Sequence, residues 1–78
     1  ELLTISGVDA SFVIYPLGEK VSISARSYGR INVQLIMEKL GGGGHLSMAA
    51  AQLTCSIGEA KEKLLSAISE YTDELKSR

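Results

Sequence analysis

The first third of the chain alternates apolar and polar residues in a way that predicts a β-hairpin. Ser11–Tyr15 is rich in β-branched and aromatic residues, and Val21–Ser27 alternates residue by residue between apolar and polar. Pro16–Glu19 lies between these runs and has the composition of a tight turn. Because residues two apart share a face of a strand, the second strand presents one polar face. That face carries Ser22, Ser24 and Arg26.

Apolar residues at helical spacing follow the hairpin. Asn32 is a typical N-cap, and Ile31 and Ile36 have the spacing of a hydrophobic staple. Four successive glycines, Gly41–Gly44, would cost too much conformational entropy inside a helix, so the helix is expected to end at Gly41. The expected buried stripe of this helix consists of Val33, Ile36, Met37 and Leu40.

The second half of the chain predicts a short helix, a strand and a long helix. Leu46–Ala50 is alanine-rich and suits one or two helical turns, and Ala51–Cys55 alternates apolar and polar residues as a strand does. Ser56 and Glu59 have the spacing of a capping box at the start of a C-terminal amphipathic helix. Its apolar stripe consists of Ile57, Ala60, Leu64, Ala67, Ile68, Tyr71 and Leu75.

Together these elements predict an α/β fold. We expect a small mixed β-sheet covered by helices, with a glycine-rich loop and a long C-terminal amphipathic helix, in one domain over residues 1–78. Glu1–Ile5 fits either a further strand or the end of a helix. A chain of this length buries only about 60% of its unfolded surface, so a neighbouring domain or a second copy is expected to complete it. Because Glu1 is not an initiator methionine, we expect a fragment of a larger protein.

Composition and charge narrow the functional classes. The net charge is −1, whereas proteins that coat nucleic acids usually show a basic face. Any anion site must therefore be built from a few positioned groups. Cys55 is the single cysteine and cannot form an internal disulfide, which predicts a reducing, cytoplasmic compartment.

The Gly41–Gly44 run followed by His45 has properties that suit an anion. Backbone N–H groups uncovered by side chains can converge on a phosphate, the helix expected to follow would add its dipole, and His45 can donate a hydrogen bond. The alternative interpretation is a flexible connector with His45 at the surface. The run is not a Walker A loop, because Lys and Ser or Thr do not follow its last glycine.

Three further side chains have chemistry that suits a ligand. The guanidinium of Arg26, at a strand end, matches phosphate oxygens, although such an arginine also forms surface ion pairs. Tyr28 can stack on a base or plug a gap in the packing, and Met48 fits a filler or a contact at the rim of a site. One histidine and no cluster of aspartates at ligand spacing predict no metal site and no catalytic residue in this chain.

A combination of these motifs resembles a known family. A strand ending in Ser-Ala-Arg-Ser at Ser24–Ser27, a capped helix at Ile31–Val33 and Gly-Gly-Gly-Gly-His at Gly41–His45, followed by an alanine cluster, resemble the DHH-associated C-terminal domain of DHH-family phosphoesterases. The resemblance covers Val8 to Ile68. The stretch from Gly41 to Leu53 is most similar to cyclic-di-AMP phosphodiesterases of the GdpP type.

The resemblance implies a larger enzyme in which separate domains carry the catalytic metal ions and bind the nucleotide. In this family an N-terminal DHH domain holds two metal ions, usually manganese, and the C-terminal domain binds the nucleotide and closes the cleft. The parent is then a phosphodiesterase acting on a cyclic dinucleotide or a short oligonucleotide, and GdpP-type relatives are anchored in the bacterial membrane with this part in the cytoplasm. The implied substrate contacts are Ser24, Arg26, Ser27, Gly42, Gly43, Gly44 and His45.

Two other functions remain open on the sequence. One is a nucleic-acid-binding domain of a DHH-family exonuclease or nanoRNase, or of an alanyl-tRNA synthetase. The balanced charge, the lack of an aromatic strip, and Ala51 in place of the glycine of many relatives count against it. The other is a structural or dimerising domain in which the glycine run only connects two elements.

Overall fold

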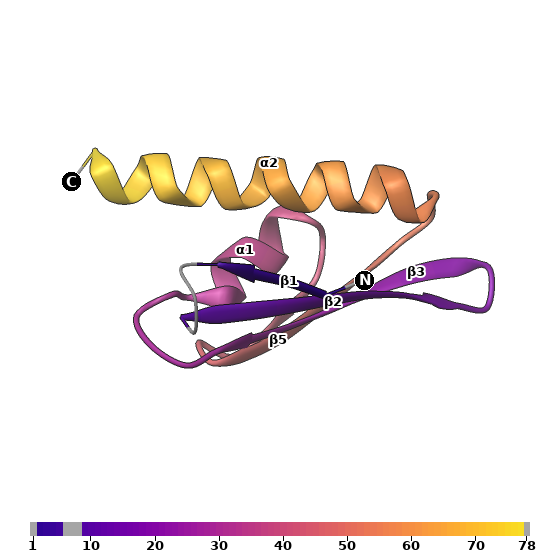
Figure 1. Cartoon of the computed structure of the whole chain (residues 1–78), viewed down its shortest axis with the longest axis horizontal. Coiled ribbons are helices and arrows are strands. Elements are labelled where there is room, and N and C mark those ends of the chain that lie inside the picture. The colour runs from indigo at the N-terminus through magenta and orange to yellow at the C-terminus, as the bar shows by residue number, and fades with distance from the viewer. Residues whose placement is uncertain (1, 6–8, 78) are drawn as a thin grey trace.

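The predicted hairpin lies at the centre of the fold (Figure 1). In the computed structural model, which describes residues 2–5 and 9–77, β2 (Ala10–Leu17) and β3 (Lys20–Ser27) pair antiparallel along their whole length. Gly18 takes a left-handed conformation, with φ 62°, at the turn between them. The hairpin is confirmed, and both strands extend beyond the runs that predicted them.

Strands on both sides of the hairpin complete a five-stranded sheet in the order β1-β2-β3-β5-β4. β1 (Leu2–Ile5) pairs with β2, β5 (Met48–Leu53) pairs with β3, and β4 (Gly43–Gly44) pairs with β5. All these pairings are antiparallel, so the small α/β domain is confirmed with an antiparallel rather than a mixed sheet. The sequence of Glu1–Ile5 fitted either a strand or the end of a helix, and Leu2–Ile5 form a strand. Glu1 lies outside the described residues.

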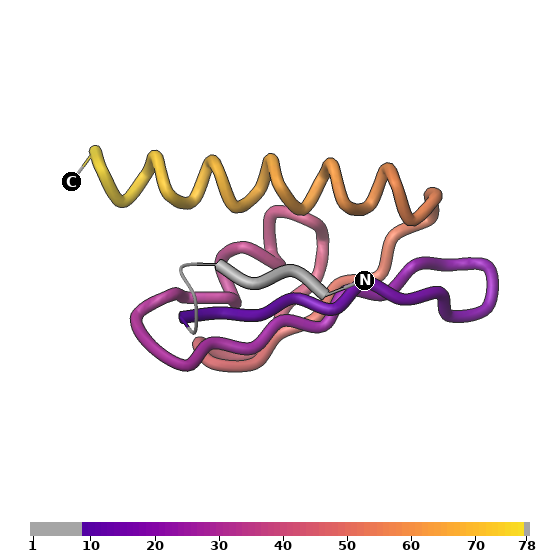
Figure 2. Tube along the Cα trace, viewed as in Figure 1, coloured from indigo at the N-terminus to yellow at the C-terminus, as the bar shows by residue number. Residues whose placement is uncertain are grey.

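Both helices lie on one face of the sheet and begin at the predicted caps. Figure 2 shows α2 (Ile57–Lys76) running along the sheet on the same side as α1 (Val33–Lys39). The Asn32 side chain accepts a hydrogen bond from the N–H of Leu35 at 3.3 Å. The capping box of Ser56 and Glu59 is formed in both directions. Neither helix is long and apolar enough to cross a membrane, a finding that covers the described residues.

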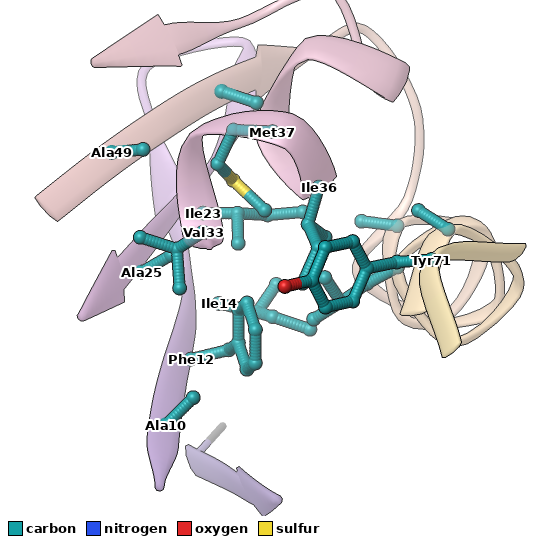
Figure 3. Close-up of a cluster of buried hydrophobic side chains, with 14 of the residues drawn as sticks. Ala10, Phe12, Ile14, Ile23, Ala25, Val33, Ile36, Met37, Ala49 and Tyr71 are labelled. Atoms are coloured by element: carbon teal, nitrogen blue, oxygen red, sulfur yellow. The ribbon is translucent and has the colours of Figure 1, made fainter. Parts of the chain in front are cut away.

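The hydrophobic core lies between this face and the helices (Figure 3). The hydroxyl of Tyr71 on α2 accepts a hydrogen bond from the backbone N–H of Asn32 at 2.9 Å, which ties α2 to the start of α1. Lys39 of α1 forms ion pairs with Glu74 at 3.0 Å and Glu70 at 3.7 Å, and these carboxylates raise the Lys39 pKa. The largest fully buried side chains are Phe12, Ile14, Ile23, Ile36, Met37, Leu64 and Val33. No helix of the described residues lies over the opposite face of the sheet (Figure 1).

The short helix expected over Leu46–Ala50 does not form. Leu46 and Ser47 make a bend, and Met48–Ala50 belong to β5. β5 has hydrogen-bonded neighbours on both sides, and Ala49 and Ala51 are buried while Met48, Ala50 and Gln52 are exposed, a period of two. Sheet pairing therefore overrides the helical preference of the alanines.

Candidate functional site

The uncovered face of the sheet arranges its side chains in rows, because directly opposed residues of antiparallel strands point to the same side. One row runs from Ser11 through Arg26 to Met48. The N–H of His45 donates to the carbonyl of Met48 at 2.6 Å, so His45 extends this row to the sheet edge. Arg26 and His45 thus lie on either side of Met48, with their backbones about 10 Å apart.

The neighbouring row is built from smaller side chains. It runs from Val13 through Ser24 and Ala50 to Gly43. The small side chains of this row form the floor of a hollow, and the longer side chains of the first row form its wall. The hollow on this face has a volume of about 610 Å³. We call it the open-face hollow, and it is lined by Ser11, Val13, Ser24, Ala25, Arg26, Tyr28, Gly43, Gly44, His45, Met48, Ala49 and Ala50.

Arg26 is the cation of the hollow. Its side chain is exposed and makes no ion pair or hydrogen bond with any residue that the structure describes. Within the part of the chain that the structure describes, Arg26 therefore does not form the surface ion pair that was its alternative role. A guanidinium without a protein partner keeps its planar set of donors for a ligand.

Ser24 lies on the floor and belongs to a small hydroxyl network. Hydrogen bonding with the side chains of Ser22 and Ser24 lowers the pKa of Tyr15. Ser22 is buried beneath this network, at 3% exposure, whereas Ser24 is exposed.

Two amides of the glycine run are used to end α1. Gly41 has φ 84° and donates to the carbonyl of Glu38 at 3.1 Å, and Gly42 donates to the carbonyl of Met37 at 2.8 Å. This pair of bonds is the Schellman arrangement of a helix C-terminus. Neither N–H is left for an anion.

The helix N-terminus expected after the glycine run does not form, because a strand follows where a helix was expected. The N–H groups of Gly41, Gly42 and His45 have protein partners, so they do not converge on an anion. The site that remains uses side chains over a floor with little bulk.

The glycines keep this floor open for different reasons. A Cβ at Gly42 would run into the carbonyl of Ala50 and lie 2.7 Å from Cα of Ala51, and a Cβ at Gly44 would lie 2.5 Å from Cα of Ala49. These two positions need glycine because β4 lies directly against β5. At Gly43 the corresponding space holds no atom within 4 Å, so a side chain there would project into the hollow.

Of the predicted contacts, the structure brings together Ser24, Arg26, Gly43, Gly44 and His45. Ser27 and Gly42 do not line the hollow. The Ser27 hydroxyl instead accepts from the N–H of Gly29 at 3.3 Å and lies 3.4 Å from the carbonyl of Asp9, so it fixes the loop after β3.

Five lining residues were not identified as contacts from the sequence: Ser11, Val13, Ala25, Ala49 and Ala50. Ser11 and Val13 alternate with buried residues in β2, which is a signal for this face. Ala49 and Ala50 join it only through the pairing of β5 with β3 and β4, which sequence periodicity does not encode.

The part of the chain that the structure describes gathers no three His, Cys, Asp or Glu side chains that could hold a metal ion. Cys55 is a free thiol, partly buried against the core just after β5. The described residues therefore do not fit a manganese site.

Comparison with known proteins places these features in a family. Residues 1–74 match the DHHA1 domain. The chain is 61% identical to the cyclic-di-AMP phosphodiesterase GdpP of Geobacillus thermodenitrificans and 60% identical to the cyclic-di-AMP phosphodiesterase PdeA of Listeria monocytogenes. It is 56% identical to GdpP of Bacillus subtilis.

Each of these alignments spans 72 residues, which is 90% of this chain and 11% of the relative. The chain thus corresponds to a small part of proteins named for hydrolysing a cyclic dinucleotide. The matched residues run from β1 almost to the end of α2 and include the whole open-face hollow. The chain therefore belongs to the DHHA1 domain family.

Proposed function

We propose that this chain is the substrate-binding domain of a cyclic-di-AMP phosphodiesterase and that the open-face hollow receives the substrate phosphate. One observation carries the proposal: Arg26 and His45, from distant parts of the sequence, lie in one row on either side of Met48 and line one hollow whose floor is Ser24, Ala50 and Gly43. The relatives' names supply the substrate class.

The chemistry of binding follows from three kinds of group. The Arg26 guanidinium offers a charge-assisted fork to phosphate oxygens, and the His45 imidazole offers a hydrogen bond from the other side. The Ser24 hydroxyl can donate from below while its oxygen accepts from the phenolic O–H of Tyr15. The absence of a side chain at Gly43 lets the anion approach the sheet, where fewer water molecules screen these contacts.

In this proposal the domain binds and orients the substrate, and hydrolysis is carried out elsewhere. The family resemblance implies that a separate DHH domain of the same polypeptide holds manganese. The described residues of this chain gather no three His, Cys, Asp or Glu side chains that could hold a metal ion. That parent protein would be anchored in the bacterial membrane with this domain in the cytoplasm. The role left to this chain is to hold the phosphate and neutralise its charge.

A comparison of ligands tests the proposal. In the protein that carries this domain together with its catalytic domain, cyclic-di-AMP should bind more tightly than a short single-stranded RNA of unrelated sequence. Its binding should weaken when Arg26 is changed to Ala. Preferential binding of the RNA would favour the nucleic-acid-binding function, and binding of neither ligand would favour a structural role.

A further inference from the structure

The open-face hollow is larger than a phosphate needs. Its volume of about 610 Å³ falls within the range of sites that hold whole small-molecule ligands. Its polar groups are concentrated in Ser24, Arg26 and His45. The remaining wall, formed largely by Val13, Met48 and Tyr28, offers an anion little to bind.

Tyr28 is an exposed aromatic ring on a fixed backbone. Its side chain is 63% exposed and forms no hydrogen bond with the residues that the structure describes. Its N–H donates to the carbonyl of Asp9 at 2.9 Å, and the N–H of the preceding Ser27 donates to the carbonyl of Ser47 at 2.8 Å. A residue that plugs a packing gap would be buried, so Tyr28 does not plug one.

Met48 continues the apolar wall next to Arg26. It lies directly opposite Arg26 across β3 and β5, and its side chain is 52% exposed. Tyr28 directly follows the end of β3 and lines the open-face hollow together with Arg26 and Met48. A planar ring and a polarisable thioether therefore border the cation on neighbouring sides.

We infer that Tyr28 and Met48 form a nucleobase subsite, in which the base stacks on the Tyr28 ring and its edge contacts Met48 while Arg26 holds the phosphate of the same nucleotide. This inference rests on the proposed function, since it needs the phosphate in the open-face hollow. Stacking on an aromatic side chain suits any base, so the subsite selects nucleotides over other phosphates.

The test separates the base from the phosphate. Binding of cyclic-di-AMP and of ribose 5-phosphate, which has no base, is measured by calorimetry or ligand-observed NMR in the protein that contains the catalytic domain. Y28A should weaken cyclic-di-AMP binding on the order of tenfold and leave ribose 5-phosphate binding unchanged. Y28F should bind both ligands as the wild type does, because stacking needs the ring and not the hydroxyl.

A matched control is available at Leu46. Its side chain is also 63% exposed, but it does not line the hollow, so L46A should bind both ligands normally. Unchanged circular dichroism and melting temperature establish that each variant is folded.

Arg26→Ala distinguishes failure of this inference from failure of the proposed function. It should weaken both ligands, because both carry phosphate. If R26A weakens both and Y28A weakens neither, or weakens both equally, the nucleobase subsite is overturned and the phosphate site stands. If R26A changes neither ligand, the proposed function fails as well.

Discussion

At the scale of single residues, the four glycines of the run have three separate roles. Gly41 supplies the left-handed conformation that ends α1. Gly42 and Gly44 let β4 lie against β5, where a Cβ would meet backbone atoms. Gly43 has neither constraint and opens onto the hollow. The run is therefore more than a flexible connector, because at least three of its positions have a geometric need for glycine.

These roles predict that alanine at Gly42 lowers stability, whereas alanine at Gly43 weakens ligand binding. Gly42→Ala should lower the free energy of unfolding by about 1–3 kcal/mol, because the new methyl group collides with β5. Gly43→Ala should change the free energy of unfolding by less than about 0.5 kcal/mol. It should nevertheless weaken cyclic-di-AMP binding, because its methyl group projects into the hollow.

Thermal or urea unfolding of the two variants, together with a cyclic-di-AMP titration of each in the complete protein, gives the comparison. Equal destabilisation by both substitutions would show that β4 is placed differently from the structure. Normal ligand binding by G43A would remove Gly43 from the site.

At the scale of elements, the sequence predicted what local periodicity can encode. The hairpin and the two long apolar stripes have strong periods, and the Asn32 and Ser56 caps are local signals. Ser24 and Arg26 were placed on the correct face for the same reason. Ile57 and Leu75, at the two ends of the α2 stripe, are 38% and 46% exposed, because the core lies beneath the middle of the helix.

The elements that local sequence did not predict are those fixed by distant pairing. Met48–Ala50 became a strand because β3 and β4 flank it, although alanines favour helices. The same pairing brings Met48 and Ala50 beside Arg26 and Ser24. The glycine run predicted that another group approaches its backbone closely. In the structure Gly42 and Gly44 lie against β5, and only Gly43 opens onto the hollow.

The packing of α2 gives an element-scale prediction with a neighbouring control. Leu64 is fully buried against the core, whereas Leu65 is 49% exposed. Leu64→Ala should lower the free energy of unfolding by about 2–5 kcal/mol, since it leaves a cavity. Leu65→Ala should cost less than about 1 kcal/mol. Chemical denaturation measures both values, and similar costs would mean that α2 is rotated about its axis.

At the scale of the whole molecule, the sheet separates the hydrophobic core from the proposed binding site. Its covered face holds the core under α1 and α2, and its uncovered face holds the open-face hollow. Substitutions in the hollow can therefore change binding while leaving the core intact. The proposed function assigns phosphate binding to this face and hydrolysis to a separate domain.

This separation predicts that the isolated chain is inactive. With manganese and cyclic-di-AMP, the purified 78-residue chain should release no linear dinucleotide above the rate of the buffer blank. Chromatography of the nucleotides after a long incubation measures this. Turnover that co-purifies with the chain through further steps, and scales with its concentration, would contradict the assignment of catalysis to another domain.

The central claim is that the open-face hollow binds the substrate phosphate through Arg26 and His45. Its most direct test is the dissociation constant of cyclic-di-AMP for R26A and H45A in the complete protein, with R30A as the control because Arg30 is exposed and outside the hollow. Loss of a charge-assisted hydrogen bond predicts roughly tenfold to a hundredfold weaker binding for the first two variants. R30A should bind like the wild type. Wild-type dissociation constants for both R26A and H45A, in folded protein, would contradict the claim.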